Sequence, residues 1–131
     1  MSNPANVTLS MIAPGQTFTY SIFTQSGGTY TVKAVDQKGT ELLNKTVSGV
    51  NWNCTAGAVA TSADTSTWPV NLIITGSGGA TLSVLEGAQI LNGYNANYVA
   101  SYVVAIDDAG TGSDRDFQDL VVTINGYRSI G

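Results

Sequence analysis

The chain has no histidine, and its 131 residues include a single cysteine, Cys54. Without histidine, neither a Ser-His-Asp triad nor a Cys-His pair can form, and His-ligated zinc is excluded. One cysteine cannot form a disulfide within the chain, and we expect Cys54 to be a small buried apolar side chain. These absences argue against a hydrolase, and we predict that the protein is not an enzyme.

Charge is also scarce, because only 11% of the residues are charged and the net charge is −4. A negative balance disfavours binding to nucleic acid and to anionic membranes. No apolar run is long enough to span a membrane, and residues 1–6 lack the basic and apolar regions of a secretory signal. We therefore expect synthesis in the cytoplasm.

The glycine, threonine and β-branched content disfavours helices and favours strands. We expect strands at residues 7–12, 17–23, 29–35, 40–47, 68–75, 80–85, 97–106 and 119–125. A tight loop at residues 25–28 would pair the second and third of these as a hairpin, and 68–75 with 80–85 would form another. Residues 51–67 read as a longer connection with one short strand at 57–61. The pattern predicts an all-β protein, an antiparallel β-sandwich of Greek-key or hairpin strands that occupies residues 1–131 as one domain.

The most informative stretch is residues 107–119, which holds five of the nine acidic residues: Asp107, Asp108, Asp114, Asp116 and Asp119. Arg115 is the only cation nearby and cannot neutralise five carboxylates. Clustered oxygen ligands without histidine or clustered cysteine indicate Ca²⁺ or another hard cation. The glycine and glutamate of an EF-hand loop are absent, so this would be a different kind of calcium site. It would connect the two strands of a terminal hairpin.

Two other interpretations of the acidic stretch are a solvated loop between strands and a glycosidase acid and base. A glycosidase needs its two carboxyl groups on opposite sides of the sugar. Carboxylates that are consecutive or alternate on one loop are better placed to surround one ion. Most aromatic side chains, Tyr30 among them, are expected in the core. The expected exceptions are Trp52 and Tyr94.

Two segments, residues 23–32 and 114–125, together resemble the calcium-dependent fucose/mannose-binding lectins of the LecB (PA-IIL) type. The resemblance covers the first expected hairpin and the last strand, whereas the middle agrees only in hairpin spacing and Gly-Ser turns. It implies a small β-sandwich with two adjacent Ca²⁺ ions that the vicinal hydroxyls of a sugar bind directly. It also implies that export without a signal peptide is possible.

The resemblance further implies a role for individual residues. Asp114, Asp116 and Asp119 would ligate calcium, the last two bridging both ions, and the upstream acidic ligand would be Asp107 or Asp108. Gln118 stands where the family has Asn, and Gln25 would offer its backbone carbonyl. The carboxylate of Gly131 would reach a neighbouring subunit's calcium, although the tail is longer than usual and lacks the family's Trp-Pro. The implied sugar-binding set is Gln25, Ser26, Gly27, Gly28, Asp108, Asp114, Asp116 and Asp119.

Two main hypotheses follow. The first is a lectin for glycans that contain fucose or mannose, assembled as a homodimer or homotetramer. The second is a structural or adhesive β module that calcium stabilises and that has no sugar site. The loop of Ser26, Gly27 and Gly28, which tunes sugar preference in the family, favours the first, and so does the number of acids, because a single structural ion would not need so many. A fragment of a carbohydrate-active enzyme is a weaker third possibility.

Overall fold

A computed structural model describes residues 4–76, 81–108 and 117–128 of the chain. The described part is built from strands and one short 3₁₀ turn, η1 (Thr65–Thr67), and no helix in it is long and apolar enough to cross a membrane. The strands are β1 (Ala5–Leu9), β2 (Thr17–Val35), β3 (Glu41–Ala60), β4 (Val70–Gly76), β5 (Ser83–Gly93), β6 (Ala96–Asp107) and β7 (Leu120–Tyr127). The predicted all-β class is confirmed.

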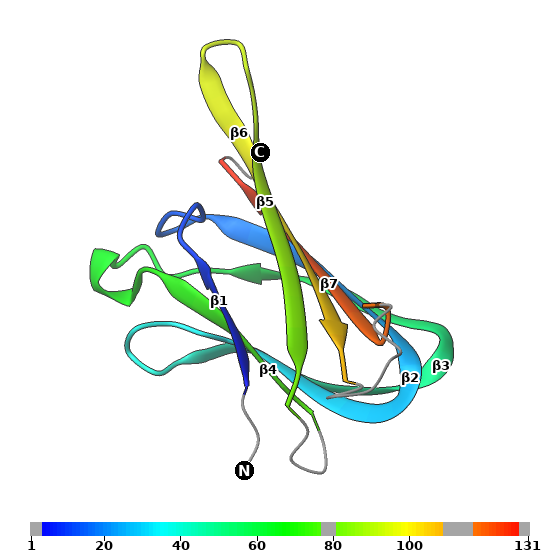
Figure 1. The fold of residues 1–131 in the computed structure, drawn as a ribbon. Coiled ribbons are helices and arrows are strands. Elements are labelled where there is room, and N and C mark those ends of the chain that lie inside the picture. The colour runs from blue at the N-terminus through cyan, green and yellow to red at the C-terminus, as the bar shows by residue number, and fades with distance from the viewer. Residues whose placement is uncertain (1–3, 77–80, 109–116, 129–131) are drawn as a thin grey trace.

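The strands form one antiparallel sheet in the order β1-β4-β2-β7-β6-β5, with β3 paired to β2. The long strand β2 lies in the middle of this order and belongs to both halves of the sheet, because residues 17–24 pair with β7 and residues 30–35 pair with β4. Between these halves β2 bends, and β3 follows it (Figure 1). The bend folds the sheet over itself, which places β1 and β4 in one layer and β5, β6 and β7 in the other.

The core fills the space between these layers. Residues that alternate along each strand are buried, as on β2, where Phe18 and Ile22 are fully covered while their neighbours are half-exposed. Strand β7 shows the same period of two, as expected for a strand with one buried face. The largest fully buried side chains are Tyr30, Phe18, Leu9, Ile12, Ile22, Leu72, Ile74, Ile106, Leu120 and Ile124.

The prediction of a hairpin loop at residues 25–28 is wrong. The chain does not reverse there, and β2 continues through the segment with register shifts at Thr24/Ser26 and Ser26/Thr29. The Gly27-Gly28 pair that suggested a turn instead lies in bulges, which bend a strand without ending it. The strand that forms a hairpin with β2 is β3, which is reached after a turn at Asp36–Gly39, where the Gly39 amide donates to the Asp36 carbonyl at 3.0 Å.

Three other predictions are corrected. Residues 51–60 are part of β3, so the short strand expected at 57–61 is confirmed as far as Ala60, but residues 51–56 are strand and not connection. Their polar sequence reflects a strand that, among the described strands, pairs with β2 alone and is exposed along most of its length. Cys54 is accordingly exposed, not buried, because it pairs directly with Phe23 on the outer face. The second proposed hairpin is also absent, since β4 pairs with β1 and β2 while β5 pairs with β6.

Candidate functional site

The terminal hairpin brings three acidic residues together. Strand β6 ends at Asp107, and the pairing of Ile106 with Leu120 sets the residues just beyond it beside those that precede β7. One carboxylate oxygen each from Asp107, Asp108 and Asp119 lies within 4.8 Å of the other two. The Asp108 amide also donates a hydrogen bond to Oδ2 of Asp119 at 2.9 Å. The prediction that the acidic stretch connects two paired strands is confirmed, and the residues at its two ends lie next to each other.

The burial and spacing of this acidic cluster fit a hard cation. Asp107 is fully buried, and Asp108 and Asp119 are partly buried. Carboxylates this close repel one another, and low solvent exposure strengthens the repulsion. Calcium binds oxygen at 2.3–2.6 Å, so two oxygens on one ion are at most about 5 Å apart. The observed spacing therefore allows all three residues to contact the same ion.

The bulged segment of β2 is hydrogen-bonded to this cluster. The Ser26 hydroxyl donates to Oδ2 of Asp108 at 3.2 Å and accepts from the Gly28 amide at 3.0 Å. The Tyr30 hydroxyl donates to the same Asp108 oxygen and lies 3.1 Å from Oγ of Ser26. The segment that the sequence associated with sugar preference and the acidic stretch thus form one site, although more than 75 residues separate them in the chain.

Tyr30 is the site residue that the sequence analysis missed. Its burial in the core is confirmed, with 1% of its surface exposed, but its hydroxyl points to Asp108. Burial and then the hydrogen bond to Asp108 raise the pKa of Tyr30 above its ordinary value, so the phenol stays protonated and can donate. A signal was present in the sequence, because Ser26, Gly28 and Tyr30 alternate as residues on one face of a strand do.

The two glycines of the segment differ in their surroundings. A Cβ at Gly28 would lie 3.1 Å from Oδ2 of Asp108 and 3.3 Å from the Tyr30 hydroxyl, which leaves almost no room for a side chain. A Cβ at Gly27 would meet nothing within 4 Å. Gly28 is therefore required for close packing against the acidic cluster, whereas Gly27 borders open space.

Gln25 joins the site to its neighbouring strands. Its amide donates to the Asp119 carbonyl at 3.1 Å, and its side-chain oxygen accepts from the Trp52 amide at 3.0 Å. Gln118 lies half-buried next to Asp119. Both Asp107 and Asp108, left as alternatives by the sequence, have an oxygen in the cluster. The roles expected of Asp114, Asp116 and Gly131 stay predictions, because these residues lie outside the described part of the chain.

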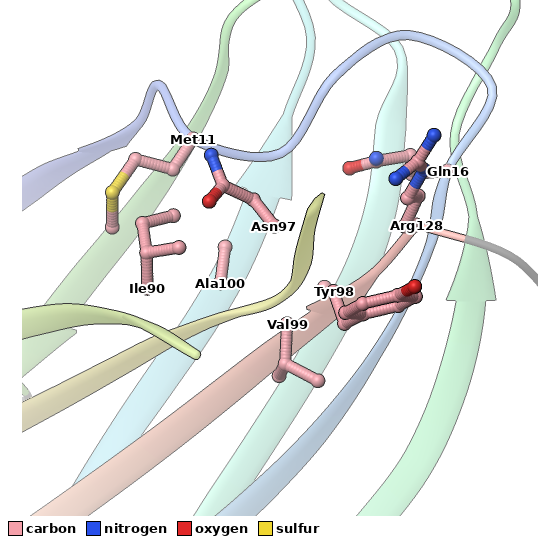
Figure 2. A pocket seen from close by; sticks show the side chains of 9 residues that line it. Met11, Gln16, Ile90, Asn97, Tyr98, Val99, Ala100 and Arg128 are labelled. Atoms are coloured by element: carbon pink, nitrogen blue, oxygen red, sulfur yellow. The ribbon is translucent and has the colours of Figure 1, made fainter. Parts of the chain in front are cut away.

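A separate hollow lies at the opposite end of the terminal hairpin, where β6 begins and β7 ends (Figure 2). Its volume is about 380 Å³, and Met11, Ile90 and Val99 are among the residues that line it. The Arg128 guanidinium lies 5.8 Å from the centre of the Tyr98 ring, a cation–π contact at its edge. None of the described residues that line this hollow is acidic, and none belongs to the acidic cluster.

A family model, "Fucose-binding lectin II (PA-IIL)", matches residues 9–128, which is nearly the whole chain. The protein belongs to this lectin family. The matched region includes both the bulged segment of β2 and the acidic stretch. Membership places the chain among carbohydrate-binding lectins, and the resemblance noted in the sequence is confirmed.

Solved lectin structures share the fold. The Chromobacterium violaceum lectin CV2L, in complex with alpha-methyl-fucoside, superposes with a TM-score of 0.68 at 17% identity, and the match covers 100% of this chain and 99% of that one. A Ralstonia solanacearum high-affinity mannose-binding lectin superposes with a TM-score of 0.67 at 18% identity, and the match covers 96% of each chain. The C-terminal domain of the BC2L-C lectin from Burkholderia cenocepacia superposes with a TM-score of 0.64 at 14% identity, and the match covers 100% of each chain. A comparison with curated proteins finds no significant sequence match.

Proposed function

We propose that the protein is a calcium-dependent lectin that binds fucose- or mannose-type sugars at the acidic cluster. The observation that supports this most strongly is the convergence of three carboxylates within 4.8 Å beside the bulged segment of β2. Acidic side chains that merely face solvent would not require hydrogen bonds from the bulged segment. Here Asp108 is held by Ser26 and Tyr30, so the carboxylate is in place before any ligand arrives.

In this proposal Asp107, Asp108 and Asp119 would supply carboxylate oxygens to two Ca²⁺ ions. Asp114, Asp116 and Gln118 would complete the ligand set, and Gln25 would add its backbone carbonyl. Bound calcium would supply residual positive charge and coordination positions at which sugar hydroxyls can replace water. The contribution of the protein is to position the oxygens and to keep Asp108 fixed through the Ser26 and Tyr30 hydroxyls.

The bulged segment would determine which sugar fits. In the described arrangement the Ser26 hydroxyl donates to Asp108 and accepts from Gly28, so its hydrogen bonds are directed into the protein. Ser26 would then influence sugar preference largely through the position of Asp108. The open space beside Gly27 leaves room for a ring substituent of the sugar.

Binding without turnover is the expected outcome for a member of a lectin family. We also propose that a homodimer or homotetramer presents several sites, because clustering of weak monosaccharide sites raises the overall affinity through avidity. The alternative, a β module that calcium stabilises without a sugar site, remains the second candidate. The acidic cluster supports both functions, whereas its contact with Ser26 favours the lectin.

Isothermal titration of L-fucose and of D-mannose into the protein tests the proposal, with calcium present and again after EDTA. Heat that depends on calcium with either sugar is the expected result, and the ranking of the two sugars tests the role of Ser26. Calcium binding without heat from either sugar would favour the structural module. Failure to bind calcium would contradict both candidates. Incubation with glycosides that leaves no free sugar products would match the expected absence of turnover.

A further inference from the structure

Next to the candidate site, β3 leaves its regular pairing with β2. Thr24 pairs with Asn53 and Ser26 pairs with Gly49, so the three residues 50–52 face Gln25 alone. The excursion presents two large apolar side chains to solvent, since Val50 and Trp52 each have 50% of their surface exposed. A half-exposed indole on a strand is well placed to contact a ligand, because it offers a wide apolar face with little conformational freedom.

The backbone of this excursion is strained. Asn51 has φ = 69° and Trp52 has φ = 57°, which puts two consecutive residues with side chains in the left-handed region. Hydrogen bonds hold them there, from the Trp52 amide to Oε1 of Gln25 at 3.0 Å and from Nδ2 of Asn53 to the Ser48 carbonyl at 3.1 Å. A left-handed conformation at residues with side chains costs free energy and persists where the surroundings enforce it.

The same hydrogen bonds connect Trp52 to the acidic cluster. The Gln25 amide donates to the Asp119 carbonyl at 3.1 Å, while its side chain accepts from Trp52. Asp119, Gln25 and Trp52 therefore lie side by side on three neighbouring chain segments. The backbone of Gln25 bonds to that of Asp119 directly and reaches Trp52 through its side chain, so the backbones of Trp52 and Asp119 are separated by one strand spacing and one glutamine side chain, on the order of 10 Å. This separation suits the sugar residue next to the one held at the cluster.

We propose that Trp52 forms a second carbohydrate subsite, on which the penultimate residue of a glycan packs while its terminal residue occupies the acidic cluster. The inference rests on the proposed function and adds a preference for oligosaccharides over monosaccharides. The face of a pyranose ring that carries C–H bonds is apolar and slightly positive, so it packs on the negative face of the indole. Gln25 is the positioning residue, because its side chain fixes the backbone of Trp52.

Tryptophan fluorescence, excited selectively over tyrosine, tests this directly, because the chain has only two tryptophans and Trp68→Phe leaves Trp52 as the sole tryptophan. The probes are methyl α-L-fucoside, methyl α-D-mannoside, and disaccharides that carry the same terminal residues in each common linkage. With calcium, at least one disaccharide should bind about 3- to 10-fold tighter than its methyl glycoside and should change the emission of Trp52. Trp52→Ala should remove this gain and leave the affinity for the methyl glycoside within about twofold.

The matched control is Tyr94→Ala, which removes an aromatic side chain that is 95% exposed at the turn between β5 and β6. That variant should keep the full gain. The subsite is overturned if no disaccharide binds tighter than its methyl glycoside, or if the gain survives in Trp52→Ala. In either case the binding of the methyl glycosides with calcium would leave the lectin function standing. Absence of that binding would overturn the proposed function, and the subsite with it.

Discussion

The main-chain amide of Asp108 donates a hydrogen bond to the carboxylate of Asp119, with 2.9 Å between the nitrogen and Oδ2. This bond joins the residue that follows β6 to the residue that precedes β7, so it closes the base of the acidic stretch. The register of the two strands sets it, because Ile106 pairs with Leu120. The sheet therefore arranges the carboxylates of Asp107, Asp108 and Asp119, and an ion would meet these three groups already close together.

Asp119→Asn should weaken calcium binding by at least about tenfold, because calcium affinity depends on the number of charged oxygens in the site. The amide oxygen of asparagine can still accept the hydrogen bond from Asp108, so the hairpin should fold. Calcium titration by calorimetry measures the change. Glu86→Gln is the matched control, since it removes an equal charge from the exposed part of β5. Equal calcium affinity in the two variants would exclude Asp119 as a ligand.

Removal of calcium should lower thermal stability if calcium binds only the folded chain. At a free concentration 100 times the dissociation constant, a single ion adds about 2.7 kcal/mol to the free energy of unfolding. We expect the melting temperature to fall by several degrees after EDTA and to recover with calcium. Magnesium should restore less, because it gives up its waters reluctantly. Superimposable melting curves with and without calcium would contradict the assignment of the cluster as a calcium site.

Gly28→Ala should disturb the site, and Gly27→Ala should not. The new Cβ at residue 28 would lie 3.1 Å from Oδ2 of Asp108, so either the carboxylate or the strand must shift. We expect a loss of about 1–3 kcal/mol in the free energy of unfolding, with weaker calcium binding. Urea denaturation and calcium titration of the two variants form a matched pair. If both variants lost similar amounts of stability and calcium affinity, the glycine at residue 28 would be needed for backbone flexibility and not for its close contact with Asp108.

Tyr30→Phe should reduce stability by about 1–3 kcal/mol at neutral pH, because it leaves Asp108 without one of its donors. The pH dependence should change as well. The folded-state pKa of Tyr30 is raised above its ordinary value of 10.0, so the folded protein retains a proton that the unfolded chain releases. The stability from this group is complete below pH 10 and is lost as the pH rises above it.

Urea denaturation between pH 7 and pH 11 gives the measurement. The free energy of unfolding of the wild type should fall more steeply above pH 10 than that of Tyr30→Phe, and the difference isolates Tyr30 from the other tyrosines and lysines. Parallel curves for the two proteins would mean that the phenol titrates alike in the folded and unfolded states. Tyr20→Phe offers a control at another buried tyrosine of β2.

Local sequence patterns were enough to predict the class of the fold and to indicate which kind of ligand the acidic stretch suits. Alternation such as that of Phe18, Tyr20 and Ile22 specifies a strand with one buried face, because side chains on a strand point to opposite sides in turn. The density of aspartates in residues 107–119, with no histidine anywhere, indicated a hard cation. Both are local properties, and both can be deduced without knowing what lies across the sheet.

Which segments of the chain meet depends on the three-dimensional fold. The Gly27-Gly28 pair is compatible with a turn or with a bulge, and the choice depends on the partners of β2, which pairs with β7 before the bend and with β4 after it. That choice brings the Tyr30 hydroxyl to Asp108 and Gln25 to Trp52. Pairing between distant strands arises from packing over the whole core, so no window of sequence contains it.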